Sequence, residues 1–245
     1  MLFSKYIPPP VTNITFIPSL SAIFNNSGTY HVKLIASNGV ESDSVTKSVR
    51  VYRLPQVNFT ANSTVICLGD SLILTSNITP GDAPVTNYAW GLGNGVASSI
   101  ANPAYIYGQT GAYDIILVVQ DSNHCSVNLT KAHYISIVNK PVAAFTASPA
   151  TSCDTSQLIT FTNNSIGVGL NYVWQLDDSI TSVAVNPSYT YNEQIQDVWL
   201  NVTDSNGCSS KVRHRIAVTP AVADFSANKT NVCAGMEVTF ANNSV

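Results

Sequence analysis

Charged side chains are scarce in this chain. Only 10% of its 245 residues are Asp, Glu, Lys or Arg, the formal net charge is −3, and no cluster of Lys or Arg occurs. Such a surface does not capture nucleic acid by charge, so that class of partner is excluded. No apolar run reaches the roughly 18 residues of a membrane-spanning helix. Residues 1–10 lack the apolar segment of a secretory signal peptide, which leaves a cytosolic protein or an internal piece of a secreted one.

Catalytic and metal-binding patterns are also missing. The sequence contains no Gly-x-Ser-x-Gly, no His-Glu-x-x-His and no phosphate-binding loop, and its four histidines show no metal-ligand spacing. Asp121 and Asp204, with Asp177 or Asp178, are the candidates for a Ca²⁺ site. They are too few for the six or more oxygen ligands that Ca²⁺ needs, and we expect Asp121 and Asp204 to cap turns instead. The sequence therefore predicts no enzyme and no cofactor, with Ca²⁺ as the one metal to consider.

Helical periodicity is absent, whereas apolar and polar residues alternate along the whole chain. Stretches such as 30–34, 114–119 and 198–202 follow a period of two, and Gly, Pro, Asn and Asp punctuate them. This pattern is typical of short strands in an all-β sandwich.

An internal repeat is the strongest signal in the sequence. Three phenylalanines each begin a Phe-Thr/Ser-Ala segment, and a cysteine follows each of them by eight residues. The pairs are Phe59 with Cys67, Phe145 with Cys153, and Phe225 with Cys233. Residues 121–125 match residues 204–208, and residues 24–30 match residues 107–113. A period of this length indicates a tandem array of small domains.

The repeats divide the chain into four parts. Residues 55–139 and 140–220 are complete repeats, whereas residues 1–54 hold only later strands and residues 221–245 only the first two. Half a sandwich leaves an unpaired sheet edge and an open apolar face. We therefore expect the chain to be a fragment of a longer array.

Two tryptophans mark equivalent points of the complete repeats. Each ends a predicted strand just before a turn, which is typical of a sandwich-core tryptophan rather than of a ligand platform. The residues predicted to form the core motif are Trp90, Gly93, Gly95, Tyr107, Tyr113, Trp174 and Tyr191. Tyr105 and Tyr189 lie two residues before Tyr107 and Tyr191 and share a sheet face with them. Glycan stacking by Tyr105 and Tyr189 stays open beside a packing role.

These motifs resemble those of the PKD domain, an Ig-like module. The resemblance rests on Trp-Gly-Leu-Gly-Asn-Gly at 90–95, Asn-Pro-x-Tyr-x-Tyr at 102–107 and Gly-x-Tyr-x-Ile-x-Leu-x-Val-x-Asp at 111–121, and the next repeat is more divergent. The added cysteines resemble those of repeats in large surface proteins of Bacteroidetes, including gliding-motility adhesins exported by type IX secretion. The resemblance implies an extended rod of Ig-like sandwiches at the cell surface or outside the cell.

The cysteines, two in each complete repeat and one in the last partial repeat, show no zinc spacing and predict structural disulfides. Two connectivities stay open: an intra-repeat set, Cys67–Cys125 and Cys153–Cys208, and an inter-repeat bond, Cys67–Cys208. The strand layout of the family puts Cys67 and Cys125 at opposite ends of their repeat, whereas a disulfide needs Cα atoms within about 7 Å. That layout favours the inter-repeat bond. It leaves Cys233 unpaired in this fragment.

The expected function is that of a non-enzymatic structural or adhesive spacer in a secreted or cell-surface protein. Its expected partners are neighbouring repeats of the same protein, together with surface glycans or other proteins. Two alternatives stay open. One is a polysaccharide- or collagen-binding accessory module of a secreted hydrolase. The other is a filament subunit that assembles head to tail, because residues 221–245 supply the strands that residues 1–54 lack.

Overall fold

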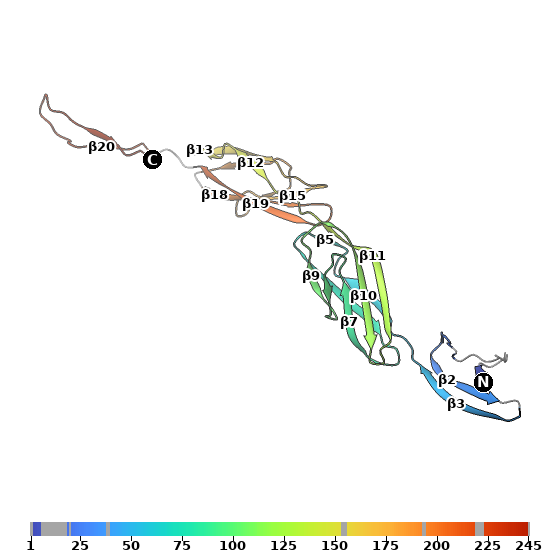
Figure 1. Cartoon of the computed structure of the whole chain (residues 1–245). Coiled ribbons are helices and arrows are strands. Elements are labelled where there is room, and N and C mark those ends of the chain that lie inside the picture. The colour runs from blue at the N-terminus through green and yellow to red at the C-terminus, as the bar shows by residue number, and fades with distance from the viewer. Residues whose placement is uncertain are drawn as a thin grey trace. The chain divides into compact units, whose positions relative to one another are not determined.

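A computed structural model describes residues 2–5, 19, 21–37, 40–152, 156–192, 195–218 and 223–244. The chain divides into two compact units, Met1–Ile137 and Val138–Val245. Strands are the only regular structure in the described ranges (Figure 1). The prediction of an all-β chain with several Ig-like sandwiches is confirmed.

The first unit contains a small antiparallel sheet and one complete sandwich. The small sheet has the order β1-β2-β3, with β1 (Leu2–Lys5), β2 (Gly28–Ser37) and β3 (Ser42–Val51). One layer of the sandwich has the order β4-β6-β9, with β4 (Gln56–Ala61), β6 (Ser71–Thr79) and β9 (Ala104–Ile106). The other has the order β5-β11-β10-β7-β8, with β5 (Val65–Cys67), β7 (Val85–Gly91), β8 (Ala97–Ser98), β10 (Gly111–Asp121) and β11 (Ser126–Val138).

The second unit repeats this topology strand for strand. Its three-stranded layer has the order β12-β14-β17, with β12 (Phe145–Ser148), β14 (Gln157–Asn163) and β17 (Ser188–Tyr191). Its five-stranded layer has the order β13-β19-β18-β15-β16, with β13 (Thr151–Ser152), β15 (Asn171–Gln175), β16 (Thr181–Ser182), β18 (Ile195–Thr203) and β19 (Ser209–Val218). A hairpin of β20 (Phe225–Ala227) and β21 (Phe240–Asn242) follows.

Each sandwich has one core, built from the inward-facing residues of both layers. In the first sandwich Phe59 packs edge-on against Trp90, with ring centroids 5.2 Å apart. In the second, Phe145 packs in the same way against Trp174 at 5.0 Å. Edge-to-face pairs add stabilisation to the burial of the rings. Alternation along the strands therefore places the repeated aromatic residues together, as the repeat pattern predicts.

Side-chain hydrogen bonds recur in the two sandwiches. Tyr107 donates its hydroxyl proton to Leu92 O at 2.8 Å, and Tyr191 donates to Leu176 O. The asparagine of each Asn-Pro segment accepts a hydrogen bond from a backbone N–H of the neighbouring strand. Asn102 Oδ1 accepts from Ser76 N, and Asn186 Oδ1 accepts from Asn163 N, both at 2.8 Å. These bonds fix the chain where it crosses from one layer to the other.

The segment before β2 has the local structure of the segment before β10. Tyr30 donates its hydroxyl proton to Asn26 O at 2.9 Å, and Tyr113 donates to Gln109 O at 3.0 Å. The Tyr30 ring lies 4.4 Å from the Phe24 ring, between centroids, just as Tyr113 lies 4.2 Å from Tyr107. Residues 24–30 therefore match residues 107–113 in structure as well as in sequence.

The final hairpin exposes the aromatic residues that the sandwiches bury. Phe225 and Phe240 are 66% and 64% exposed, although their rings contact each other. The residues equivalent to Phe225, which are Phe59 and Phe145, are 0% and 3% exposed, and those equivalent to Phe240, which are Leu74 and Phe161, are 1% and 0% exposed. An apolar face is thus open on β20 and β21.

Candidate functional site

Both motif tryptophans are buried in the sandwich cores. Trp174 donates its indole proton to Ala184 O at 2.9 Å, whereas Trp90 Nε1 has no hydrogen-bond partner among the described residues. Gly93 and Gly95 follow Trp90 and have φ angles of 78° and 85°. A Cβ on residue 93 would lie 2.7 Å from Asp114 O, so this turn needs glycine there. The two tryptophan rings therefore belong to the cores and are not exposed for a ligand to stack on.

The tyrosines considered for glycan stacking are half-buried. The Tyr105 ring meets Tyr107 edge-on at 4.9 Å, and its hydroxyl accepts a hydrogen bond from Asn94 Nδ2 at 2.9 Å. Tyr189 packs on Tyr191 in the same way, and its hydroxyl bonds to an Asp177 oxygen at 3.3 Å. Burial, and then the charges of Tyr105 and Tyr113, raises the pKa of Tyr107 to about 12. Both tyrosine pairs are therefore used largely for packing.

The two turn aspartates cap their own loops. Asp121 Oδ1 accepts hydrogen bonds from the backbone N–H groups of Asn123 and Cys125, both at 2.9 Å. Asp204 Oδ1 accepts from Asn206 at 2.8 Å and from Cys208 at 2.9 Å. The prediction that these residues cap turns is confirmed. No group of three or more His, Cys, Asp or Glu side chains that could hold a metal occurs in the described ranges.

The cysteines differ in their bonding. Cys67 and Cys208 are both disulfide-bonded, whereas Cys125 and Cys233 are free thiols. Cys153 lies outside the described residues. Cys67 and Cys208 are the two members of the favoured inter-repeat pair, and that connectivity stays a prediction.

The intra-repeat bond Cys67–Cys125 is not formed, since Cys125 is free. The strands explain why. Thr64 O, just before β5, accepts a hydrogen bond from Ser136 N at the far end of β11, whereas Cys125 directly precedes β11. Residues 126 and 136 are ten steps apart along the strand, about 33 Å at 3.3 Å per residue. Cys67, three residues after Thr64, is therefore far beyond the roughly 7 Å that a disulfide spans.

The joint between β3 and β4 is a cluster of hydrogen bonds and ion pairs. Arg53 N donates to Asp82 Oδ2 at 3.0 Å, and Asp82 N donates back to Arg53 O at 3.2 Å. Arg53 Nη2 also donates to Gly81 O at 3.1 Å. The carboxylate of Asp82 lies 3.7 Å from Arg53 Nε and 3.9 Å from Arg50 Nη2. The joint segment thus binds the turn at 80–82 through backbone and side chain together.

Gly81 is required by this close approach. A Cβ on residue 81 would collide with Arg53 O and would lie 2.8 Å from the carbonyl carbon of Leu54. Only glycine lets the two backbones lie this close. The Pro80-Gly81-Asp82 turn therefore connects β6 to β7 and also binds the segment that joins β3 to β4.

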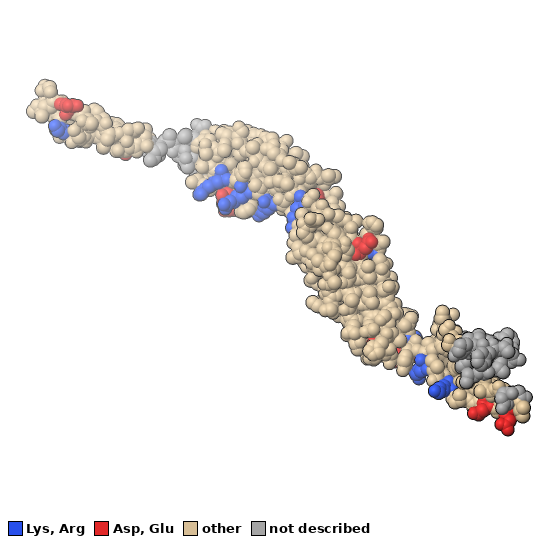
Figure 2. All heavy atoms as spheres, in the orientation of Figure 1, with Lys and Arg blue, Asp and Glu red and all other residues tan. Residues whose placement is uncertain are grey.

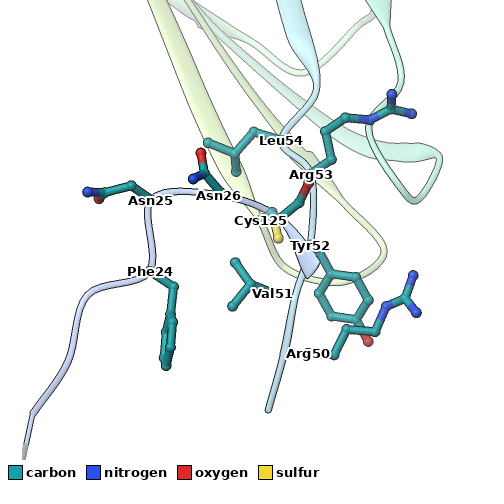
Figure 3. A pocket seen from close by; sticks show the side chains of 10 residues that line it. Phe24, Asn25, Asn26, Arg50, Val51, Tyr52, Arg53, Leu54 and Cys125 are labelled. Atoms are coloured by element: carbon teal, nitrogen blue, oxygen red, sulfur yellow. The ribbon is translucent and has the colours of Figure 1, made fainter. Parts of the chain in front are cut away.

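A groove of about 690 Å³ lies beside the joint (Figure 3). It is lined by residues 24–27 on one side and residues 50–54 on the other, with Cys125 where they meet. Burial, followed by the charges of Asp121 and Asp82, raises the pKa of the Cys125 thiol. The thiol is therefore protonated at neutral pH and a weak nucleophile. No histidine or carboxylate is among the described residues that line the groove.

Sequence analysis did not single out the third tryptophan, which lies on an exposed sheet face. Trp199 lies on β18 with its ring beneath Lys211 and Arg213 of β19, and the ring is only half-buried. The alternation in 198–202 was a usable signal. It puts Val198, Leu200 and Val202 on the core side, which leaves Trp199 on the outer side.

Comparison with known proteins identifies the type of module. Residues 52–137, about a third of the chain, match the family model of the PKD domain. This is a PKD domain-containing protein with Ig-like β-sandwich domains. The PKD domain and the disulfide-bonded cysteines indicate an extracellular protein. No curated protein matches the chain.

Several solved structures are similar to parts of the chain. The PKD1 domain of Vibrio anguillarum Epp is 25% identical, with a TM-score of 0.32, over 36% of this chain and 100% of that one. The PKD1 domain of the Vibrio cholerae metalloprotease PrtV is 25% identical, with a TM-score of 0.31, over 34% of this chain and 96% of that one. The fibronectin(III)-like modules of Clostridium thermocellum CbhA are 14% identical, with a TM-score of 0.40, over 66% of this chain and 95% of that one.

Proposed function

We propose that the chain is a non-enzymatic spacer of a secreted or cell-surface protein, in which Ig-like repeats are joined without free hinges. The joint at Arg53 supports this most directly. A flexible linker leaves its backbone to water, whereas Arg53 uses its N–H, its C=O and its guanidinium to bind residues 81 and 82. Membership among Bacteroidetes surface proteins exported by type IX secretion is part of this proposal and rests on the cysteine pattern.

Limited proteolysis tests the joint. Trypsin cleaves after Arg53 only when the segment leaves the 80–82 turn and becomes extended. We expect slow cleavage there in the native chain and cleavage about tenfold faster in Asp82→Ala, which removes a charge-assisted hydrogen bond and two ion pairs. Asp114→Ala is the control, because it removes a carboxylate from the same sandwich away from the joint. Equal cleavage rates in the native chain and Asp82→Ala would refute a held joint.

We also propose that Cys67 bonds with Cys208 and so links consecutive repeats. The free thiol of Cys125 and the disulfide-bonded states of Cys67 and Cys208 support this pairing. Peptide mapping without reductant is the test. A cross-linked peptide pair containing Cys67 and Cys208 is expected, and recovery of either residue bonded to any other cysteine contradicts the proposal.

A second function, a filament subunit, is favoured by the exposed faces of Phe225 and Phe240. Another copy's β2–β3 sheet would cover this face if β20 and β21 completed that sheet. Light scattering between 1 µM and 1 mM separates the two functions, because strand donation predicts growth in mass and the spacer predicts a constant monomer. The third function, an accessory module that holds polysaccharide or collagen beside a catalytic domain, requires an exposed binding face. The exposed outer side of β15, β18 and β19 supports this third function.

A further inference from the structure

Aromatic and basic side chains share the outer face of the sheet formed by β15, β18 and β19. Val198 and Leu200 of β18 are buried in the core, so Trp199 between them points to the outside. The strand register places Trp199 opposite Arg213 on β19 and opposite Gln175 on β15. The indole is therefore at the centre of this face.

Three basic residues form a row along β19 on the same face. Lys211, Arg213 and Arg215 alternate with inward residues, are all exposed, and follow each other at about 7 Å. In the described part of the sheet face only Asp197 opposes them, with its Oδ2 3.2 Å from Arg213 Nη1. Figure 2 shows a group of blue Lys and Arg side chains over the region of β18 and β19. Three cations and one carboxylate leave an excess of two positive charges in a chain whose net charge is −3.

The Trp199 ring orders two of these cations. Lys211 Nζ lies 4.1 Å and Arg213 Cζ 5.5 Å from the ring centroid, both within the range of cation–π attraction. Long basic side chains normally lose rotamer freedom when they bind an anion, and this loss weakens binding. Contact with the indole removes part of that freedom beforehand. The face thus presents its positive charge in a partly ordered form.

The fold does not require these residues, because the first sandwich lacks them. Trp90 lies opposite Leu117 and Trp174 opposite Leu200, so Trp199 corresponds to Ile116. Ile116 lies opposite Gly91 and Thr130, at the positions of Gln175 and Arg213. The equivalent of Lys211 is Asn128, opposite Val118. An outer face without this tryptophan and these cations serves the same architecture, so the basic face on the second sandwich has another role.

We propose that the outer face of β15, β18 and β19 binds an acidic polysaccharide, whose carboxylate or sulfate groups pair with Lys211, Arg213 and Arg215. This goes beyond the spacer function. The cations select anions, and the amides of Gln175 and Asn201, which flank Trp199 on β15 and β18, suit a chain rich in hydroxyl groups. An acidic peptide offers few hydroxyls to these amides. Two excess charges are too few for stable attachment to a nucleic-acid backbone or to an anionic lipid surface.

Binding of the full chain to defined polymers tests the proposal. Calorimetry or surface plasmon resonance would compare alginate, which carries carboxylates, and dextran sulfate with uncharged dextran. We expect binding to at least one acidic polymer, none to dextran, and several-fold weaker binding at 0.5 M than at 0.05 M NaCl. Which acidic polymer binds more tightly identifies the anionic group. Tighter binding of poly-glutamate or phosphatidylserine vesicles, or equal binding of dextran, would overturn the proposal.

Exchanging residues between equivalent positions of the two sandwiches gives a pair of matched variants. The triple variant W199I/K211N/R213T gives the second sandwich the residues found at 116, 128 and 130, and it should lose affinity about tenfold or more. The reciprocal variant I116W/N128K/T130R should create a second site and raise the number of sites bound per chain. Unchanged binding in both variants contradicts the assignment. A folded triple variant, checked by its thermal unfolding, is required for the first comparison, and the reciprocal variant tests the idea independently of it.

Discussion

The two sandwiches of this protein have the same interior and different exteriors. Phe59 with Trp90 and Phe145 with Trp174 form the same edge-on pairs, and a tyrosine hydroxyl bonds the same carbonyl in both. On the outer sheet face, however, Ile116 of the first sandwich is replaced by Trp199 with its basic neighbours in the second. Packing constrains the interior, because adding or removing a single methylene there lowers the stability of the fold. The exterior is free to differ, and function is to be sought there.

The largest effect on stability is expected from truncating the core tryptophans that both sandwiches share. Trp90→Ala and Trp174→Ala should each lower the free energy of unfolding of their sandwich by about 3–5 kcal/mol. Trp174→Phe should cost about 1 kcal/mol more than Trp90→Phe, because only Trp174 leaves a carbonyl, Ala184 O, without its donor. Hydrogen exchange resolved by peptide reports each sandwich separately. Loss of protection in the unmutated sandwich to the same extent would contradict independent cores.

Alkaline pH should lower the free energy of unfolding, because it ionises a tyrosine buried in the same interior. Tyr107 has its pKa raised to about 12, whereas an unfolded tyrosine ionises near 10, so the folded chain holds its proton longer. The stabilisation is complete below pH 10 and is lost as the pH rises through 12, by about 2–3 kcal/mol in all. Urea unfolding between pH 9 and 12 measures this loss. Tyr107→Phe should flatten the pH dependence of the first sandwich, while Tyr191→Phe, a matched variant, should leave that sandwich unchanged.

A smaller effect on stability is expected at the turn after the core tryptophan, where the two sandwiches differ. Gly93 has a positive φ angle and no room for a Cβ, whereas its equivalent in the second sandwich is Asp177. Gly93→Ala should therefore cost about 2 kcal/mol, and Asp177→Ala well under 1 kcal/mol. Thermal unfolding of the two variants gives the difference. Equal costs would mean that the first turn adapts to a side chain.

The smallest effect should come from the exterior. Arg213 and Asp197 form an ion pair in which both side chains are largely exposed to solvent. Pairs of this kind contribute little, so Arg213→Ala should change the free energy of unfolding by less than about 0.5 kcal/mol. The same variant should weaken binding to an acidic polysaccharide. If Arg213→Ala instead caused a large loss of stability, the Arg213–Asp197 pair would serve to hold the fold together.

The sequence allowed the interior to be predicted because its signals are local. Trp90, Tyr107 and Tyr113 lie within one repeat at fixed spacings, and alternation alone directs them to the core. The Arg53–Asp82 joint was not predictable in this way, since its partners lie 29 residues apart and meet only through the turn at Gly81. Trp199 was missed for a related reason. Its neighbours Lys211 and Arg213 belong to another strand, and only the register of β18 against β19 brings them over the ring.

The short parallel pairing of β13 with β19 has a mechanical consequence. Thr151 lies beside Ala217 and Ser152 beside Val218, so an early strand of the sandwich runs alongside its last one in the same direction. Tension applied at the two ends of the repeat pulls these strands past each other in opposite senses. The hydrogen bonds between them then carry the load together in shear, whereas a hairpin pulled open from its free end breaks one bond at a time. The two residue pairs are therefore loaded in shear whenever the repeat is pulled from its ends.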